Sequence, residues 1–199
     1  KAQALGARVI AVSDSDGYIA DEEGIDLPLL KQIKEVERLR IKEYKQRKPS
    51  AVYVEGSEGI WDIPCDVAMP CATQNEISKE SAEKLIRNGL IALLEGSNMS
   101  CTAEAVQLIG EEDVLYVPAK AANAGGVATS GLEMSQNSLR LSWTFEETDQ
   151  RLDSIMTNIY RNAANAAKEY GYEGNLIVGA NIAGFLKVAE AMLAQGIAY

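Results

Sequence analysis

The stretch Lys120–Asn137, KAANAGGVATSGLEMSQN, is the most informative part of this chain. Gly125 and Gly126 lie in a run of small residues, where glycine permits close approach of the backbone to a ligand. The same segment carries ammonium, amide and hydroxyl donors, the groups that bind a carboxylate or a carboxamide. These donors are Lys120, Asn123, Thr129 and Ser130. The stretch therefore predicts a ligand-binding loop; the alternative is a glycine-rich turn that opens a helix.

Short apolar runs precede this stretch at intervals and predict strands. They lie at Ala7–Ser13, Val52–Val54, Val67–Met69, Leu90–Leu94 and Val114–Val117. Candidate helices at Ser78–Asn88 and Thr102–Ile109 separate the later runs, and an earlier helix, capped by Asp26, is expected to continue at helical spacing to Ile41. Such alternation is typical of an α/β fold with a mostly parallel sheet.

The sequence changes character after Gly131 and predicts helices to the end of the chain. Residues 132–141 have a helical pattern, and Thr144–Glu147 reads as a capping box before a long amphipathic helix that Gly171 ends. A last apolar helix follows. We therefore expect two parts, residues 1–131 around the sheet and residues 132–199 as C-terminal helices.

Composition excludes several classes of function. The 199 residues carry a net charge of −10, which argues against binding to nucleic acid. By the sequence pattern, we expect no apolar run of the roughly 18–20 residues that a membrane helix needs and no leader, and therefore no membrane partner and a cytoplasmic protein. Histidine is absent, and Cys65, Cys71 and Cys101 lack CxxC spacing, which predicts neither a usual metal site nor a disulfide framework. We expect these cysteines to be small buried hydrophobic residues.

Five blocks, in order along the chain, resemble those of hexameric glutamate dehydrogenases. They are Ser13–Gly17 (SDSDG), Pro70–Glu76 (PCATQNE), Glu95–Met99 (EGSNM), Lys120–Asn137 and Gly179–Phe185 (GANIAGF). NAGG alone is shared with related amino-acid dehydrogenases, whereas GLEMSQN and PCATQNE resemble the glutamate enzymes specifically. The resemblance implies a Rossmann-like sheet with flanking helices over residues 1–131, incomplete at its N-terminus. It also implies that residues 132–199 complete that domain and return toward a substrate domain.

The resemblance also implies roles for individual residues. It places Ser13, Asp14 and Ser15, with Asp16, by the adenosine ribose of the cofactor, and Ala72, Thr73 and Gln74 along the cofactor groove. Asn98 and Asn123 would lie near the nicotinamide. On the substrate side, Ser130 would bind the distal carboxylate of glutamate, and Val127 would shape the side-chain pocket. For each of the two asparagines the alternative is a turn residue that bonds its own backbone. Three small residues depart from the family's usual alanine, proline and threonine, namely Ser97, Ser100 and Cys101, and they put the rigidity of their loop in question.

The implied reaction is reversible oxidative deamination of L-glutamate to 2-oxoglutarate and ammonia by a homo-hexamer. The family's catalytic lysine and aspartate and its GxGNVA-type phosphate loop match nothing in this chain, and the spacing from Asp14 places that loop before Lys1. We therefore expect a fragment in which no residue is the catalytic acid or base. An isolated nucleotide-binding module without turnover and a branched-chain or aromatic amino-acid dehydrogenase are the alternatives.

The choice of cofactor rests on conflicting signals. An acidic residue such as Asp14 after the second strand usually favours the free 2′-hydroxyl of NAD, whereas SDS-type turns in this family resemble those of members that accept NADP. Arg38 and Lys42 are the cations that we expect to reach a 2′-phosphate, unless they are solvated helix charges. We predict NADP, with NAD as the alternative.

Overall fold

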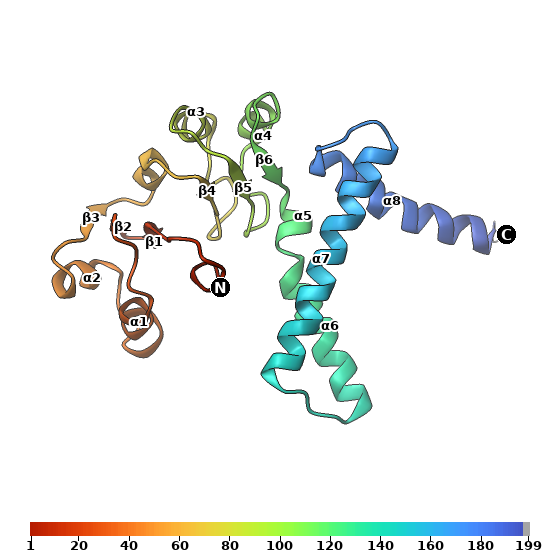
Figure 1. Cartoon of the computed structure of the whole chain (residues 1–199), viewed down its shortest axis with the longest axis horizontal. Helices are drawn as coiled ribbons and strands as arrows, with labels where there is room; N and C mark the ends of the chain where they lie inside the picture. Colours follow the sequence, from red (N-terminus) through yellow and green to blue (C-terminus); the bar gives the residue numbers. More distant parts are fainter. Residues whose placement is uncertain (197–199) are drawn as a thin grey trace.

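The computed structural model describes residues 1–196 and has an α/β fold with two three-stranded sheets. Figure 1 shows the two sheets beside each other, with the long C-terminal helices extending from the second. Within residues 1–196, no strand pairing joins the sheets, because β1 bonds only to β2 and β4 only to β5. The expected α/β fold with a parallel sheet is confirmed, and a separate antiparallel sheet lies beside it.

The first sheet is antiparallel, which the sequence analysis did not foresee. Its strands are β1 (Ala11–Ser13), β2 (Gly17–Ala20) and β3 (Val52–Glu55). A tight turn at Asp14–Asp16 joins β1 to β2, in register Ser13 to Tyr18. Three short elements follow β2, namely α1 (Leu27–Lys31), the π-helical turn η2 (Gln32–Val36) and α2 (Lys42–Arg47). The last two supply the buried side chains of Ile33 and Tyr44 to the core at this sheet, and α1 adds half-buried leucines. The predicted cap is confirmed, since Asp26 accepts the N–H of Leu29, but the helix breaks well before Ile41.

The second sheet is parallel, as predicted. It consists of β4 (Val67–Ala68), β5 (Ala92–Leu94) and β6 (Leu115–Val117), linked through α3 (Lys79–Arg87) and α4 (Ala103–Gly110). The side chains of Ser78 and Thr102 cap the two helices. A core of Ile77, Leu85, Leu93 and Ile109 packs between helices and sheet. This rigid layer fixes the positions of the loops that leave its carboxyl edge.

Four helices make up most of the rest of the chain. They are α5 (Ala119–Ala122), α6 (Ala124–Leu139), α7 (Phe145–Glu169) and α8 (Leu176–Gln195). The capping box of Thr144 and Glu147 is confirmed, and Gly171, with φ of 82°, follows the end of α7 as predicted. Figure 1 shows α7 running past the second sheet and packing against both α6 and α8. The boundary that we expect at Gly131 falls inside α6.

The expectation that no apolar run is long enough for a membrane helix is wrong, because α8 is long and apolar enough to cross a membrane. An 18-residue stretch of this 20-residue helix has a mean hydropathy of 1.6, and few residues of that stretch are buried. Phe185, Met192 and Leu193 are among the exposed apolar side chains. Length and composition alone are weak evidence for a membrane span, and the remainder of the helix packs on α7.

Candidate functional site

Three loops carry five of the eight predicted cofactor-binding residues, and all three leave the carboxyl edge of the parallel sheet. They are residues 70–76 after β4, residues 95–101 after β5 and residues 118–123 after β6. Ligands of open parallel sheets bind at this edge. The loop order follows the strand order, so residues 95–101 lie between the other two loops and contact both.

The loop of residues 70–76 presents exposed groups on a braced backbone. One carboxylate oxygen of Glu76 accepts the N–H groups of Ala72 (3.1 Å) and Thr73 (3.4 Å). Ala72, Thr73 and Gln74 are exposed, so a ligand can reach them. Asn75 adopts a left-handed conformation with φ of 53°, and its N–H donates to the carbonyl oxygen of Met99 in the next loop.

Ser97 and Ser100 tie their loop to the preceding one through their hydroxyl groups. Ser97 Oγ donates to the carbonyl oxygen of Thr73 at 2.9 Å and is hydrogen-bonded to Ser100 Oγ. Ser100 is fully buried, and its hydroxyl also reaches the carbonyl oxygen of Pro70 at 3.3 Å. The two serines that depart from the family pattern therefore form hydrogen bonds between the loops. These bonds hold residues 95–101 in place, which resolves the question about the rigidity of this loop.

Asn98 and Asn123 come together at the middle of this edge. Asn123 Nδ2 donates to Asn98 Oδ1 at 2.6 Å. Asn98 is exposed and Asn123 half-buried, so each amide retains groups that face outward. The alternative, in which each asparagine serves only its own turn, does not account for a bond between two loops. A facing pair of carboxamides can both donate to and accept from a ligand amide or hydroxyl.

The glycine-rich stretch is helical, so the alternative that we gave for it is confirmed and the ligand-wrapping loop is wrong. Gly125 and Gly126 lie in the first turn of α6, neither with positive φ. Val127 and Ser130 are both exposed and, being three residues apart on the helix, share a face. The hydroxyl of Thr129 bonds back to the carbonyl oxygen of Gly125.

Lys120 is engaged away from this helix. Its ammonium donates to Asn181 Oδ1 on α8, so it does not join Ser130 in gripping a ligand as the sequence suggests. Lys120 instead links the loop after β6 to α8.

The turn after β1 holds a cluster of charges that includes Lys34 and Arg40, two cations that we did not expect there. Lys34 Nζ lies 2.8 Å from Asp14 Oδ2, and Arg40 Nη1 lies 2.6 Å from Ser15 Oγ. Arg40 also forms an ion pair with Asp16 at 3.5 Å. Within residues 1–196, neither Arg38 nor Lys42, the cations that we expected here, forms a hydrogen bond or an ion pair with this turn. Nothing in the sequence separates Lys34 and Arg40 from the other charges of this segment.

Asp14 is occupied by protein donors. Its Oδ1 accepts the N–H of Asp16, and its Oδ2 accepts the N–H of Ile41 as well as the ammonium of Lys34. Burial acts to raise the pKa of the Asp14 carboxyl, but the hydrogen bonds from Lys34, Asp16 and Ile41 outweigh it and lower the pKa. A ribose hydroxyl would therefore compete with three donors for this carboxylate.

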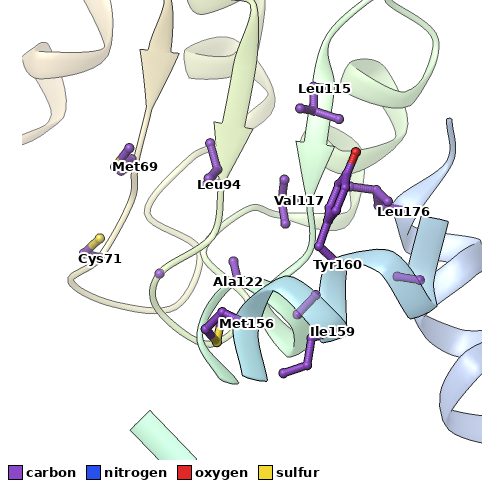
Figure 2. A pocket seen from close by; sticks show the side chains of 13 residues that line it. Met69, Cys71, Leu94, Leu115, Val117, Ala122, Met156, Ile159, Tyr160 and Leu176 are labelled. Atoms are coloured by element: carbon purple, nitrogen blue, oxygen red, sulfur yellow. The ribbon is translucent and has the colours of Figure 1, made fainter. Parts of the chain in front are cut away.

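An open apolar groove of about 440 Å³ adjoins the three loops (Figure 2). Met69, Leu94 and Val117 line it from the strand ends, and Ile159 and Tyr160 line it from α7. Its mostly apolar wall can contact an apolar ligand or protein surface, and the hydroxyl of Tyr160 adds a polar group from α7.

The cysteines match the expectation of buried hydrophobic residues only in part. Cys101 is buried, Cys65 is half-buried and Cys71 is exposed on the groove. Gly96 packs on Cys71, because a Cβ at position 96 would lie 2.5 Å from Cys71 Sγ. The loop after β5 therefore needs glycine at its first turn for close approach of the loop after β4.

Known proteins resemble this chain over nearly its whole length. The family model described as Glutamate/Leucine/Phenylalanine/Valine dehydrogenase matches residues 1–196. The glutamate dehydrogenase of Bacteroides thetaiotaomicron is 50% identical over 200 residues, covering 97% of this chain and 44% of the relative. The NADP-specific glutamate dehydrogenase of Escherichia coli is 49% identical over 203 residues, covering 99% and 44%. This chain therefore spans less than half the length of these relatives.

A solved structure shows the same fold. The crystal structure of Plasmodium falciparum glutamate dehydrogenase superposes with a TM-score of 0.92 at 42% identity, covering 98% of this chain and 43% of that one. The match includes both sheets and the C-terminal helices, because it extends over almost every described residue.

Proposed function

This chain belongs to the glutamate/leucine/phenylalanine/valine dehydrogenase family, and we propose that it is the cofactor-binding part of an NADP-using glutamate dehydrogenase. The full-length enzyme would catalyse reversible oxidative deamination of L-glutamate to 2-oxoglutarate and ammonia. The observation that carries the proposal is the meeting of PCATQNE, EGSNM and KAANAGG at one edge of a parallel sheet, with Asn98 bonded to Asn123. None of the residues that we assign is a catalytic acid or base.

NADP fits the turn after β1 better than NAD does. Arg40 is an exposed cation at the hydroxyl of Ser15, where a 2′-phosphate bound beside the turn would gain a charge-assisted contact. Asp14, the acidic group that would favour the free 2′-hydroxyl of NAD, is already bonded to Lys34 and Ile41. Ser13, Asp14 and Ser15 would thus shape the ribose site, with Arg40 selecting the phosphate.

The remaining cofactor contacts would come from the parallel sheet. Ala72, Thr73 and Gln74 are exposed along the first loop, and the Asn98–Asn123 pair offers matched donors and acceptors for the nicotinamide carboxamide. When bound, NADP supplies the hydride acceptor. This chain would hold the nicotinamide ring in one orientation toward the substrate, and such positioning lowers the barrier to hydride transfer.

The substrate would meet this chain at α6. Ser130 is exposed, with its hydroxyl on the same face as Val127 one turn earlier, so one residue would donate to the distal carboxylate of glutamate while the other shapes the pocket. A hydroxyl alone binds an ionised carboxylate weakly, so a cation from another part of the full-length enzyme would complete the contact.

The domain arrangement and the assembly are further parts of the proposal. Residues 1–131 would belong to the dinucleotide-binding domain, and residues 132–199 would complete it and return toward the substrate domain. One further strand between the open edges of β1 and β4 would join the two sheets. The exposed apolar side chains of α8 would be covered within a cytoplasmic homo-hexamer, without a membrane.

The test is a substrate profile of the full-length enzyme. We expect NADP reduction that depends on L-glutamate and is at least about tenfold slower, in kcat/KM, with leucine, valine or phenylalanine. The 199-residue chain alone should give no reduction with either cofactor. Preference for a branched-chain or aromatic amino acid would refute the assignment, and cofactor binding by the full-length protein without turnover would indicate the non-catalytic module.

A further inference from the structure

Glu95 is a buried carboxylate whose side chain bonds to two of the three loops. It is the first residue after β5 and is 4% exposed. Its Oε1 accepts the N–H of Cys101 at 2.8 Å, and its Oε2 accepts the N–H of Ala119 at 2.9 Å. The two oxygens therefore hold backbone groups from two different strand connections.

The two anchored positions lie between Asn98 and Asn123 in the chain. Cys101 ends the loop in which Asn98 is the middle residue, and Ala119 is the first residue of α5, which leads directly to Asn123. The Glu95 side chain thus closes one loop on itself and fixes the start of the other. The bond between Asn98 and Asn123 lies across these same two segments.

The surroundings of Glu95 make this link hard to replace. Burial, and next the hydrogen bond to Glu95, raises the pKa of the Tyr116 hydroxyl; burial, and next the charge of Glu95, raises the pKa of the Cys101 thiol. Within residues 1–196, no lysine or arginine forms an ion pair with Glu95. A buried carboxylate without a cation depends on its hydrogen-bond donors, so its position is determined by them.

We infer that Glu95 is a positioning residue, which sets the separation and orientation of Asn98 and Asn123 by binding Cys101 and Ala119 at once. The inference rests on the proposed function for the role of the asparagine pair, but the geometric part stands alone. Any group at position 95 must offer two acceptors, since both partners are N–H donors. Glutamine has the same size and offers only one acceptor, so its amino group would face a donor.

The first measurement is the crystal structure of the full-length Glu95→Gln enzyme, with Glu112→Gln as the matched control at an exposed glutamate. We expect the control to retain the Asn98–Asn123 bond and the Glu95→Gln variant to separate the two amides beyond hydrogen-bonding distance. An unchanged pair would overturn the inference, whatever the activity of the enzyme. If Glu95→Gln does not fold, Ala119→Pro removes the second donor at a position where proline is tolerated, because Pro118 already has ψ of 151°.

The second measurement separates positioning from general damage. We expect Glu95→Gln to lower kcat by about the same factor as Asn98→Ala, with the KM for glutamate unchanged within about twofold. In the double variant the losses should not multiply, because both changes disable the same unit. Multiplied losses would overturn the inference. A wild-type enzyme without glutamate-dependent turnover would instead refute the proposed function and leave the decision to the crystal structures.

Discussion

Replacing Gly179 by alanine should separate α8 from α7. A Cβ at this position would lie 2.0 Å from the carbonyl oxygen of Ala163 and 2.9 Å from the Cβ of Ala167, both on α7. Non-bonded heavy atoms rest about 3.5–4.0 Å apart, so α8 must retreat by roughly 1 Å or more. Overpacking of this kind costs about 3 kcal/mol, and the gain in helix propensity from Gly to Ala returns about 0.5–1 kcal/mol.

Thermal unfolding followed by circular dichroism measures this difference. A net loss of about 2 kcal/mol lowers the Tm of a domain of this size by roughly 4–8 °C. Gly184→Ala is the control on the same helix, because its Cβ would meet no atom within 4 Å, and it should leave the Tm unchanged or raise it slightly. Equal Tm values for the two variants would refute the close packing described for α7 and α8.

Three further predictions concern the proposed site and its charges. In the full-length enzyme, Arg40→Ala should raise the KM for NADP several-fold and leave the KM for NAD unchanged, whereas Arg38→Ala should leave both KM values unchanged. Equal effects of Arg40→Ala on the two cofactors would remove Arg40 from the phosphate site. Ser130→Ala should raise the KM for glutamate much more than that for NADP, since a hydrogen bond to a charged group is worth about 1.5–3 kcal/mol; a selective rise in the cofactor KM would contradict the assignment. The pKa of Asp14 is lowered by folding, so its contribution to stability is present above the unfolded pKa of about 3.9 and is lost as the pH falls through the folded pKa. Urea titrations should therefore show a smaller loss of stability on acidification below that pH in Asp14→Asn than in the wild type.

Local sequence patterns predicted the parallel half of the fold well. Apolar runs located the three strands of the second sheet, and the helices expected over Ser78–Asn88 and Thr102–Ile109 are α3 and α4. The antiparallel hairpin was missed because Asp16-Gly17 was interpreted only as a turn, although Asp-Gly between apolar segments is a hairpin signal. The two sheets also remained separate, which no local pattern could indicate, since it depends on which edges find partners.

The phosphate-site cations illustrate a different limit. Choosing Arg38 and Lys42 required a continuous helix to Ile41, in which 3.6-residue spacing fixes the direction of each side chain. The structure instead has a π-helical turn over Gln32–Val36 and a left-handed Arg38 with φ of 57°. Each irregularity rotates the following residues, so the guanidinium of Arg40 contacts the turn, whereas within residues 1–196 the side chains of Arg38 and Lys42 form no such contact. Periodicity cannot predict which charges meet once the helix breaks.

The meeting of Asn98 and Asn123 was predictable, whereas the means of holding them was not. Adjacent parallel strands bring the loops at their carboxyl ends together, and this rule alone places the two asparagines side by side. A single glutamate after a strand is not a recognisable motif, and two serines in a loop are not one either. The contacts of Glu95, Ser97 and Ser100 could therefore be identified only in the structure.

Ser97 and Ser100 show how a departure from a family pattern can preserve its physical result. Proline restricts a loop by fixing its own φ, which needs no partner. A serine leaves φ free but can fix the loop by bonding to a neighbour, and here the two hydroxyls connect to each other and to the carbonyl oxygens of Thr73 and Pro70. The restraint then depends on the adjacent loop staying in place, because a fully buried hydroxyl that loses its partner is destabilising by about 1–3 kcal/mol. The loop that carries Asn98 is therefore held by its bonds to residues 70–73, whereas a proline would restrict it independently of them.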